Sequence, residues 1–146
     1  MSPSVPIYTR PLDEKLGIKP GMRVETIDIS DPRLTAIIAD GGGQIVSGSA
    51  REPVDLIFLG ADWPPDLDRL PELRRRIRPN GAIWVVSRKG KGSTLRDTEV
   101  IEAGLASGLV DNKVVSFSDT HTAQRLVIRL ADRPAHAAEL ERATSS

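Results

Sequence analysis

A basic, glycine-rich segment at residues 88–94 is the part of the sequence best suited to hold an anion. It follows an apolar run, Ala82–Val86, and precedes a stretch with helical spacing, so we predict that it leaves a strand and enters a helix. Free backbone amides and the positive end of a helix dipole attract negative charge at such a position. Its spacing is not that of a nucleotide P-loop, and a solvated basic loop is the alternative. The candidate contacts to an anionic small molecule are Lys89, Lys91, Ser93 and Thr94.

Polar side chains also follow two of the predicted strands and are candidates for holding a cofactor. Asp28 and Ser30 come at the end of the first predicted strand, and Asp62 follows the apolar run Val54–Leu59. Nucleotide cofactors bind at the edge of a parallel sheet where the carboxyl ends of its strands meet. Asp62 opens the sequence Asp-Trp-Pro-Pro. The alternative to a role in cofactor binding is that this sequence is a rigid loop that starts the next helix.

The two histidines lie far apart in the sequence. His121 follows Asp119 by two positions and is a candidate general base, the alternative being an ordinary surface histidine in a hairpin loop. His136 lies near the C-terminus. Because the chain has two separated histidines and no cysteine, we expect no metal site.

Apolar runs and turn residues predict strands alternating with helices. The runs Val54–Leu59 and Ala82–Val86 are nearly continuous, as in strands that helices cover on both faces of a parallel sheet. Asp31 is a suitable N-cap and Pro32 a suitable first residue for a helix. Only a short polar loop separates the last two strands, so the final strand should run antiparallel. We predict strands near residues 22–29, 44–47, 54–59, 82–86, 113–117 and 125–130, and helices near 10–16, 31–41, 66–77 and 94–108.

This order predicts an α/β fold: a doubly wound, mostly parallel sheet of about six strands with a C-terminal antiparallel hairpin strand, in a three-layer sandwich. The length of 146 residues suits one domain. We expect an extended arm over residues 1–10, the α/β domain over 11–131 and a tail over 132–146.

The charge balance excludes some partners. Twenty basic and twenty acidic residues give a formal net charge of zero, so no general attraction to nucleic acid or to an anionic membrane is expected. The arginines within residues 74–78 would spread around a helix rather than form one stripe. No apolar stretch approaches the roughly 20 residues that span a bilayer. With no signal peptide evident and no cysteine, we expect a cytoplasmic protein.

Three segments resemble parts of known proteins. The start Leu16–Val24 and the segment Leu73–Val86 are similar to the approach to the first strand and to the "leader, Pro-Gly-Gly, strand" segment of class I methyltransferases. Residues Leu12–Arg129 more closely resemble a family of short bacterial proteins of unknown function with a methyltransferase-like core. In that family the segment that stands here as Glu102–Asp111 is typical. The resemblance implies the fold and brings no activity with it.

The sequence departs from an active methyltransferase where that fold binds S-adenosylmethionine. In the fold, a glycine-rich turn after the first strand lets the backbone approach the cofactor, and an acidic residue after the second strand holds the ribose. Here the turn, residues 28–32, has no glycine, and Pro32 removes an amide donor. Only Glu52 could replace the ribose carboxylate. We therefore expect a degraded cofactor loop and no bound cofactor.

Three hypotheses follow. The first is a non-catalytic methyltransferase-like domain that binds an anionic ligand or partner at residues 88–94. The second is an atypical, active S-adenosylmethionine-dependent small-molecule methyltransferase that uses Asp28 and Asp62. The third is a homodimeric interaction protein that assembles through its sheet edge or tail. An open cleft above Asp28 and Gly60 would favour the second, whereas a space filled by Ser30, Pro32 and Trp63 would exclude it.

Overall fold

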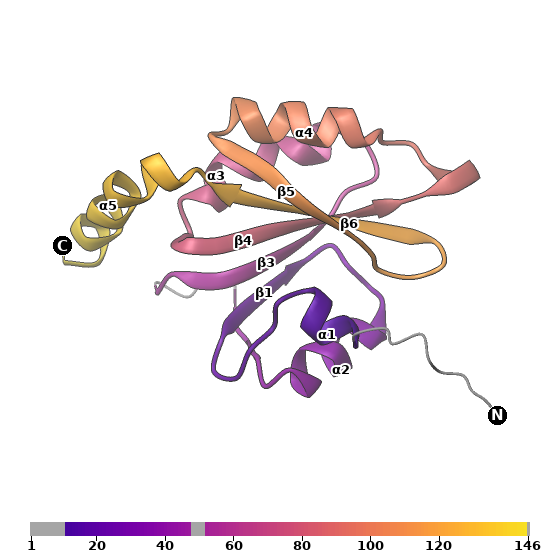
Figure 1. The fold of residues 1–146 in the computed structure, drawn as a ribbon, viewed down its shortest axis with the longest axis horizontal. Coiled ribbons are helices and arrows are strands. Elements are labelled where there is room, and N and C mark those ends of the chain that lie inside the picture. Colours follow the sequence, from indigo (N-terminus) through magenta and orange to yellow (C-terminus); the bar gives the residue numbers. More distant parts are fainter. Residues whose placement is uncertain (1–10, 48–51, 146) are drawn as a thin grey trace.

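The computed structural model describes residues 11–47 and 52–145 and shows a twisted sheet between helices (Figure 1). The predicted arm over residues 1–10 lies outside the described residues. The sheet has six strands in the order β2-β1-β3-β4-β6-β5, which confirms the predicted mostly parallel arrangement. β1, β2, β3 and β4 run parallel, and β6 is antiparallel to both β4 and β5. The strands are β1 (Arg23–Ile27), β2 (Gln44–Ile45), β3 (Val54–Gly60), β4 (Ile77–Arg88), β5 (Leu109–Ser116) and β6 (His121–Ile128).

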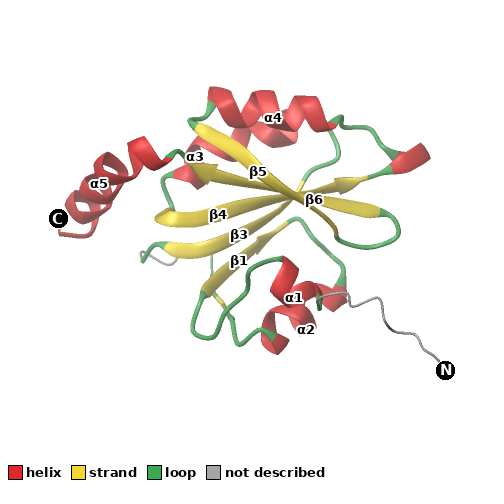
Figure 2. Cartoon of the chain, in the orientation of Figure 1, coloured by secondary structure: helices red, strands yellow, loops and turns green. Residues whose placement is uncertain are grey.

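Helices cover both faces of this sheet, as Figures 1 and 2 show. One face carries α1 (Leu12–Lys15) and α2 (Pro32–Asp40), and the other carries α3 (Leu70–Arg74) and α4 (Asp97–Ala106). Asp31 caps α2 and Pro32 begins it, as predicted. A last helix, α5 (Arg133–Ser145), extends beyond the sheet, and the short 3-10 helices are η1 (Pro64–Arg69), η2 (Gly90–Gly92) and η3 (Leu130–Asp132).

Side chains of the central strands alternate between two apolar clusters. Ile57 and Val85 face α3 and α4, whereas Phe58 and Trp84 face α1 and α2. The Phe58 and Trp84 rings stack with their centroids 6.4 Å apart, and the Trp84 indole N–H donates to the Leu16 carbonyl at 3.1 Å. The two apolar runs in the sequence are therefore the middle of the core, buried from both sides as predicted.

Several boundaries differ from the sequence prediction. β5 and β6 begin at Leu109 and His121 instead of residues 113 and 125. The helix expected to reach residue 77 ends at Arg74, and β4 begins at Ile77 instead of residue 82. The predicted turn at residues 79–81 lies inside β4, where the pairing with β3 passes from Ile77 to Ala82. The ion pair between Arg78 and Asp55, at 3.2 Å, holds this irregularity. Turn residues are thus accommodated as a bulge because the strand pairs on both sides of it.

The helix predicted to start at Thr94 begins instead at Asp97. Its N-cap is Arg96, whose backbone N–H donates to the Glu99 carboxylate at 2.9 Å. The sequence favoured a capping box formed by Thr94 and Asp97. In the structure only half of such a box forms, two residues later, with the Glu99 carboxylate as acceptor, because the Arg96 guanidinium cannot accept a hydrogen bond. The basic segment therefore ends before the helix rather than in its first turn.

The segment expected to be a tail is helical as α5, and two of its side chains bond the sheet: Arg133 Nε donates to the Ile128 carbonyl at 3.0 Å, and His136 contacts β4. His136 is 2% exposed, and its Nε2 lies 2.7 Å from the carbonyl oxygen of Ile77 at the start of β4. Among the described residues, no helix is long and apolar enough to cross a membrane.

Candidate ligand pocket at the carboxyl ends of the strands

A cavity of about 250 Å³ opens at the carboxyl ends of the parallel strands. The chain leaves β1 toward β2 on one side and later returns to β3 on the other, so the sheet order reverses between β1 and β3. Ligands of doubly wound folds bind at this reversal. We call the cavity the switch-point pocket; its lining residues are Asp28, Ile29, Ser30, Asp31, Gly60, Ala61, Asp62, Val86, Arg88, Phe117 and His121.

The loop between β1 and α2 makes its tight turn without glycine. Asp28 adopts a left-handed backbone, with φ of 55°, which aspartate tolerates better than most residues. The neighbouring strand makes room for this turn, because a Cβ atom on Gly60 would overlap the carbonyl oxygen of Asp28. Ser30 lines the cavity without filling it, and Trp63 is 58% exposed outside it. Of the two arrangements considered from the sequence, the space above Asp28 and Gly60 is the open one.

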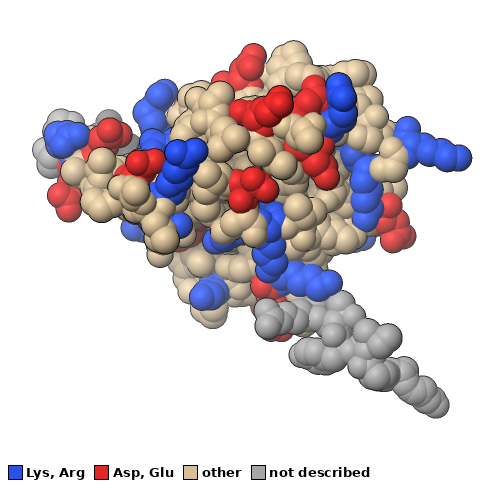
Figure 3. All heavy atoms as spheres, turned by 45° about the horizontal axis from the view of Figure 1, so that its top comes forward, with Lys and Arg blue, Asp and Glu red and all other residues tan. Residues whose placement is uncertain are grey.

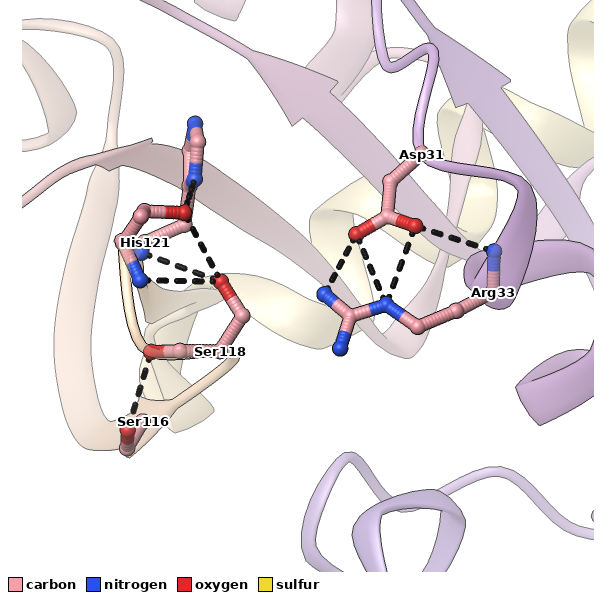
Figure 4. Close-up of polar contacts among 6 residues, drawn as sticks. Asp31, Arg33, Ser116, Ser118 and His121 are labelled. Atoms are coloured by element: carbon pink, nitrogen blue, oxygen red, sulfur yellow. Dashed lines mark hydrogen bonds and ion pairs between the residues drawn. The ribbon is translucent and has the colours of Figure 1, made fainter.

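One carboxylate of the pocket is already engaged. The Arg33 guanidinium donates to Asp31 at 2.6 Å and 3.1 Å, and the Arg33 backbone N–H donates to it at 3.0 Å (Figure 4). These hydrogen bonds to Arg33, first from its side chain and then from its backbone, lower the pKa of Asp31 from 3.8 to about 2. His121 on the opposite side of the pocket lowers it further through its charge. Asp31 therefore caps α2 as a carboxylate and is not free for a ligand.

The backbone of Asp62 is fixed by two side chains, those of Asp66 and Thr94. The Asp66 carboxylate accepts the backbone N–H groups of Asp62 at 2.9 Å and Trp63 at 3.1 Å. The Thr94 hydroxyl donates to the Asp62 carbonyl. Within the described residues, no ion pair or hydrogen bond engages the carboxylate of Asp62 or that of Asp28. Both carboxylates are exposed and are available to a ligand that donates hydrogen bonds.

The end of β4 and the start of β6 supply the positive side of the pocket. Arg88 and His121 are direct partners in the antiparallel ladder. His121 Nδ1 lies 2.8 Å from the Thr120 hydroxyl, and Ser118 Oγ accepts the His121 backbone N–H at 3.1 Å (Figure 4). These bonds keep His121 in place at the rim of the cavity.

The structure brings some of the predicted residues together and separates others. Asp28, Ser30 and Asp62 line the switch-point pocket together. Lys89 and Ser93 line a separate open groove of about 400 Å³, which Arg88 also lines. Thr94 lies outside both, its hydroxyl bound to Asp62. Lys91 is exposed and lies outside both as well.

Two residues with weak or no sequence signal belong to the pocket. Arg88 stands at its edge beside the predicted anion contacts. His121 is the candidate general base of the sequence analysis, for which a surface histidine was the alternative. The signal that could have shown their proximity is the antiparallel pairing of the last strand, β6, with β4. Glu52, the candidate for the ribose, instead pairs with Arg23 at 3.8 Å at the amino end of β1, on the opposite edge of the sheet. Among the described residues no group of histidine and carboxylate side chains suits a metal ion.

The surface charge gives no competing site on the face in view. Figure 3 shows Lys and Arg interspersed with Asp and Glu over that face. This mixture agrees with the formal net charge of zero. A large single-sign field, which nucleic acid binding requires, is absent from it.

The fold and the position of the pocket define an α/β domain built like the core of class I methyltransferases. Three solved structures share this fold. A SAM-dependent methyltransferase from Aquifex aeolicus has a TM-score of 0.55 and 18% identity, and the match covers 81% of this chain and 88% of that one. The CcbJ methyltransferase from Streptomyces caelestis has a TM-score of 0.57 and 9% identity, with 79% of this chain and 92% of that one covered. A mitomycin 7-O-methyltransferase has a TM-score of 0.59 and 11% identity, with 75% of this chain and 49% of that one covered. At these identities the likeness shows the fold alone.

The chain itself belongs to the family DUF3052, described as a protein of unknown function, which matches residues 13–130. No curated protein matches the sequence. The resemblance seen in the sequence is thereby confirmed.

The pocket differs in two respects from a usual binding site for S-adenosylmethionine. Its volume of about 250 Å³ lies below the roughly 300–1,000 Å³ of pockets that enclose drug-sized ligands. The start of α2, which would face the cofactor, offers no amide at Pro32, and the Arg33 amide is bonded to Asp31. Because of these two differences, we derive no methyl-transfer step for this pocket.

Proposed function

We propose that this protein is a methyltransferase-like domain that binds a small polar ligand in the switch-point pocket and transfers no methyl group. The observation that carries the proposal is the open cavity at the strand reversal, lined by two carboxylates, Asp28 and Asp62, without partners among the described residues. An open, polar-lined cavity at this place in a doubly wound fold is the usual site of a ligand.

The lining indicates what such a ligand looks like. Asp28 and Asp62 accept hydrogen bonds, so they suit hydroxyl or amino groups. Ala61 is 3% and Phe117 5% exposed, so both bury the ligand against an apolar wall. The volume suits a molecule of the size of an amino acid, a pentose phosphate or a nucleoside. The ligand is therefore small and carries several donors.

The basic segment adds a second element to the proposal. Lys89 and Ser93 line the open groove beside the pocket, and Arg88 forms the wall that the two share. Lysine and arginine at this wall favour a ligand or partner with negative charge. The Lys89 ammonium is bonded to Ser116 Oγ at 2.6 Å, which directs it along the rim.

Chemical-shift mapping of backbone amides tests the proposal. L-serine, ribose 5-phosphate and adenosine are the probes, each at concentrations up to about 10 mM, where even a site of millimolar Kd is occupied. We expect at least one of them to shift the amides of residues 28–31 and 60–62 saturably. Asp62→Asn should weaken that response about tenfold, the loss of one charge-assisted hydrogen bond. Asp68→Asn, an exposed carboxylate on η1, is the matched control. No response from any probe would overturn the proposal.

The second candidate is an active, atypical SAM-dependent small-molecule methyltransferase. The observation that favours it is the openness of the space above Asp28 and Gly60, which the sequence did not lead us to expect. In that case Asp28 would hold the cofactor and Asp62 the substrate. Asp28→Ala would then abolish cofactor binding measured by calorimetry, whereas an unchanged affinity would exclude this role.

A further inference from the structure

Arg88 and His121 form a pair of donors on one face of the sheet. They are directly opposite in the β4–β6 ladder, so their Cβ atoms are about 5 Å apart. Both side chains line the switch-point pocket. Within the described part of the chain, no carboxylate forms an ion pair with Arg88. Two adjacent groups that bear or can bear positive charge repel each other unless an anion lies between them.

The ring of His121 is oriented by its neighbour. The Thr120 hydroxyl engages Nδ1 at 2.8 Å, so Nε2 is the ring atom left for a ligand. The hairpin that carries the ring is closed by backbone bonds, in which Phe117 and Ser118 both donate to the His121 carbonyl at 3.1 Å. A ring held in this way loses little conformational freedom when it binds.

The negative groups of the pocket do not satisfy this pair. The carboxylate of Asp31 interacts electrostatically with His121, but both of its oxygens accept hydrogen bonds from Arg33. The carboxylates of Asp28 and Asp62 remain available to accept hydrogen bonds from donor groups of the ligand. Opposite signs thus occur in one cavity, with carboxylates at the ends of β1 and β3 and cationic groups at the ends of β4 and β6.

We infer that the ligand of the switch-point pocket carries an oxyanion, a carboxylate or a phosphate group, which is held between the Arg88 guanidinium and His121 Nε2. This inference rests on the proposed function and adds the class of ligand to it. The guanidinium presents two parallel N–H groups that match the oxygens of either anion. The oxyanion subsite is therefore inside the pocket, at Arg88 and His121, and Lys89 lies in the adjoining groove.

Resonances of the histidine rings report directly on this subsite. Inorganic phosphate and acetate are the two probes, and the tighter of them identifies the kind of oxyanion. We expect saturable shifts of the His121 ring signals and none for the buried His136, which serves as the internal reference. Arg88→Gln should weaken the response about tenfold. Arg75→Gln, which removes an exposed charge after α3, should leave it unchanged.

Each further outcome separates the two proposals. If neither anion moves the His121 ring while adenosine still shifts the amides of residues 60–62, the oxyanion subsite is wrong and the proposed function stands. An equal loss in Arg88→Gln and Arg75→Gln would mean diffuse attraction, which also contradicts the subsite. If none of the probes, the anions included, affects the pocket, both proposals are overturned.

Discussion

Gly60 determines whether the end of β3 and the loop after β1 can lie so close together. An added Cβ would overlap the Asp28 carbonyl, which belongs to the backbone and cannot rotate away. We predict that Gly60→Ala destabilises the protein by about 1–3 kcal/mol through overpacking. Urea unfolding measures this change.

Gly92→Ala is the control for that substitution. The nearest atom to its added Cβ would be Arg88 Cδ at 3.9 Å, an ordinary contact. We expect its stability to stay within about 0.5 kcal/mol of the unsubstituted protein. Equal stability of the two variants would mean that the close approach at Gly60 does not exist.

Asp31 makes a second prediction at the level of one residue. Asp31→Ala should cost about 1 kcal/mol, because it removes the N-cap of α2, whereas Asp31→Asn keeps a good cap and should cost less. The folded-state pKa is lowered from 3.8 to about 2, so the carboxylate's extra stabilisation is complete above about pH 4 and is lost as the pH falls through 2. Thermal melts at neutral and acidic pH should show the difference between the protein and Asp31→Asn vanishing on acidification. A difference that persists at the lowest pH would contradict the assignment.

At the scale of elements, His136 is one of the side chains that hold α5 against the sheet, beside Arg133, which bonds the Ile128 carbonyl. This side chain is 2% exposed and bonds the Ile77 carbonyl at 2.7 Å. We predict that His136→Ala costs about 1–3 kcal/mol, because a buried acceptor loses its partner. Hydrogen exchange of α5 amides should accelerate in this variant more than in Glu139→Ala, an exposed position on the same helix. Equal exchange in both variants would show that α5 is not held by His136.

The elements that could be predicted from the sequence are those whose signal is local. Continuous apolar runs identified the centres of β3 and β4, and Asp31 with Pro32 identified the start of α2. The start of β6 was missed because its first residues are polar. Thr122 and Gln124 hide a strand whose neighbour Ala123 is buried, so the apolar pattern began only at residue 125.

The composition of the pocket was predictable only in part, for the same reason. Asp28, Ser30 and Asp62 follow strands that the sequence shows, and they do meet in one cavity. His121 joins them through the pairing of β6 with β4, which sets Arg88 opposite it. That register depends on long-range pairing, which a local pattern does not contain. The glycine that allows the tight turn at Asp28 is Gly60, on a different strand from the loop in which a glycine was sought.

For the whole molecule, the sheet order and the cavity at its reversal are those of a nucleotide-binding α/β fold, whereas the loop chemistry is not. The core is complete on both faces, so the departures in the loop after β1 are not signs of a collapsed domain. Asp31 and Pro32 use the start of α2 for capping, where a cofactor would need its amides. The structure therefore keeps the cavity at the reversal of the sheet order and differs in the loop that lines it.

Calorimetric titration with S-adenosylmethionine and its demethylated product tests this account most directly. We predict no saturable heat from either compound, because the cavity of about 250 Å³ and the capped start of α2 leave neither the volume nor the donors that they need. Saturable binding of one molecule per chain that is lost in Asp28→Ala would contradict the account and favour an active methyltransferase.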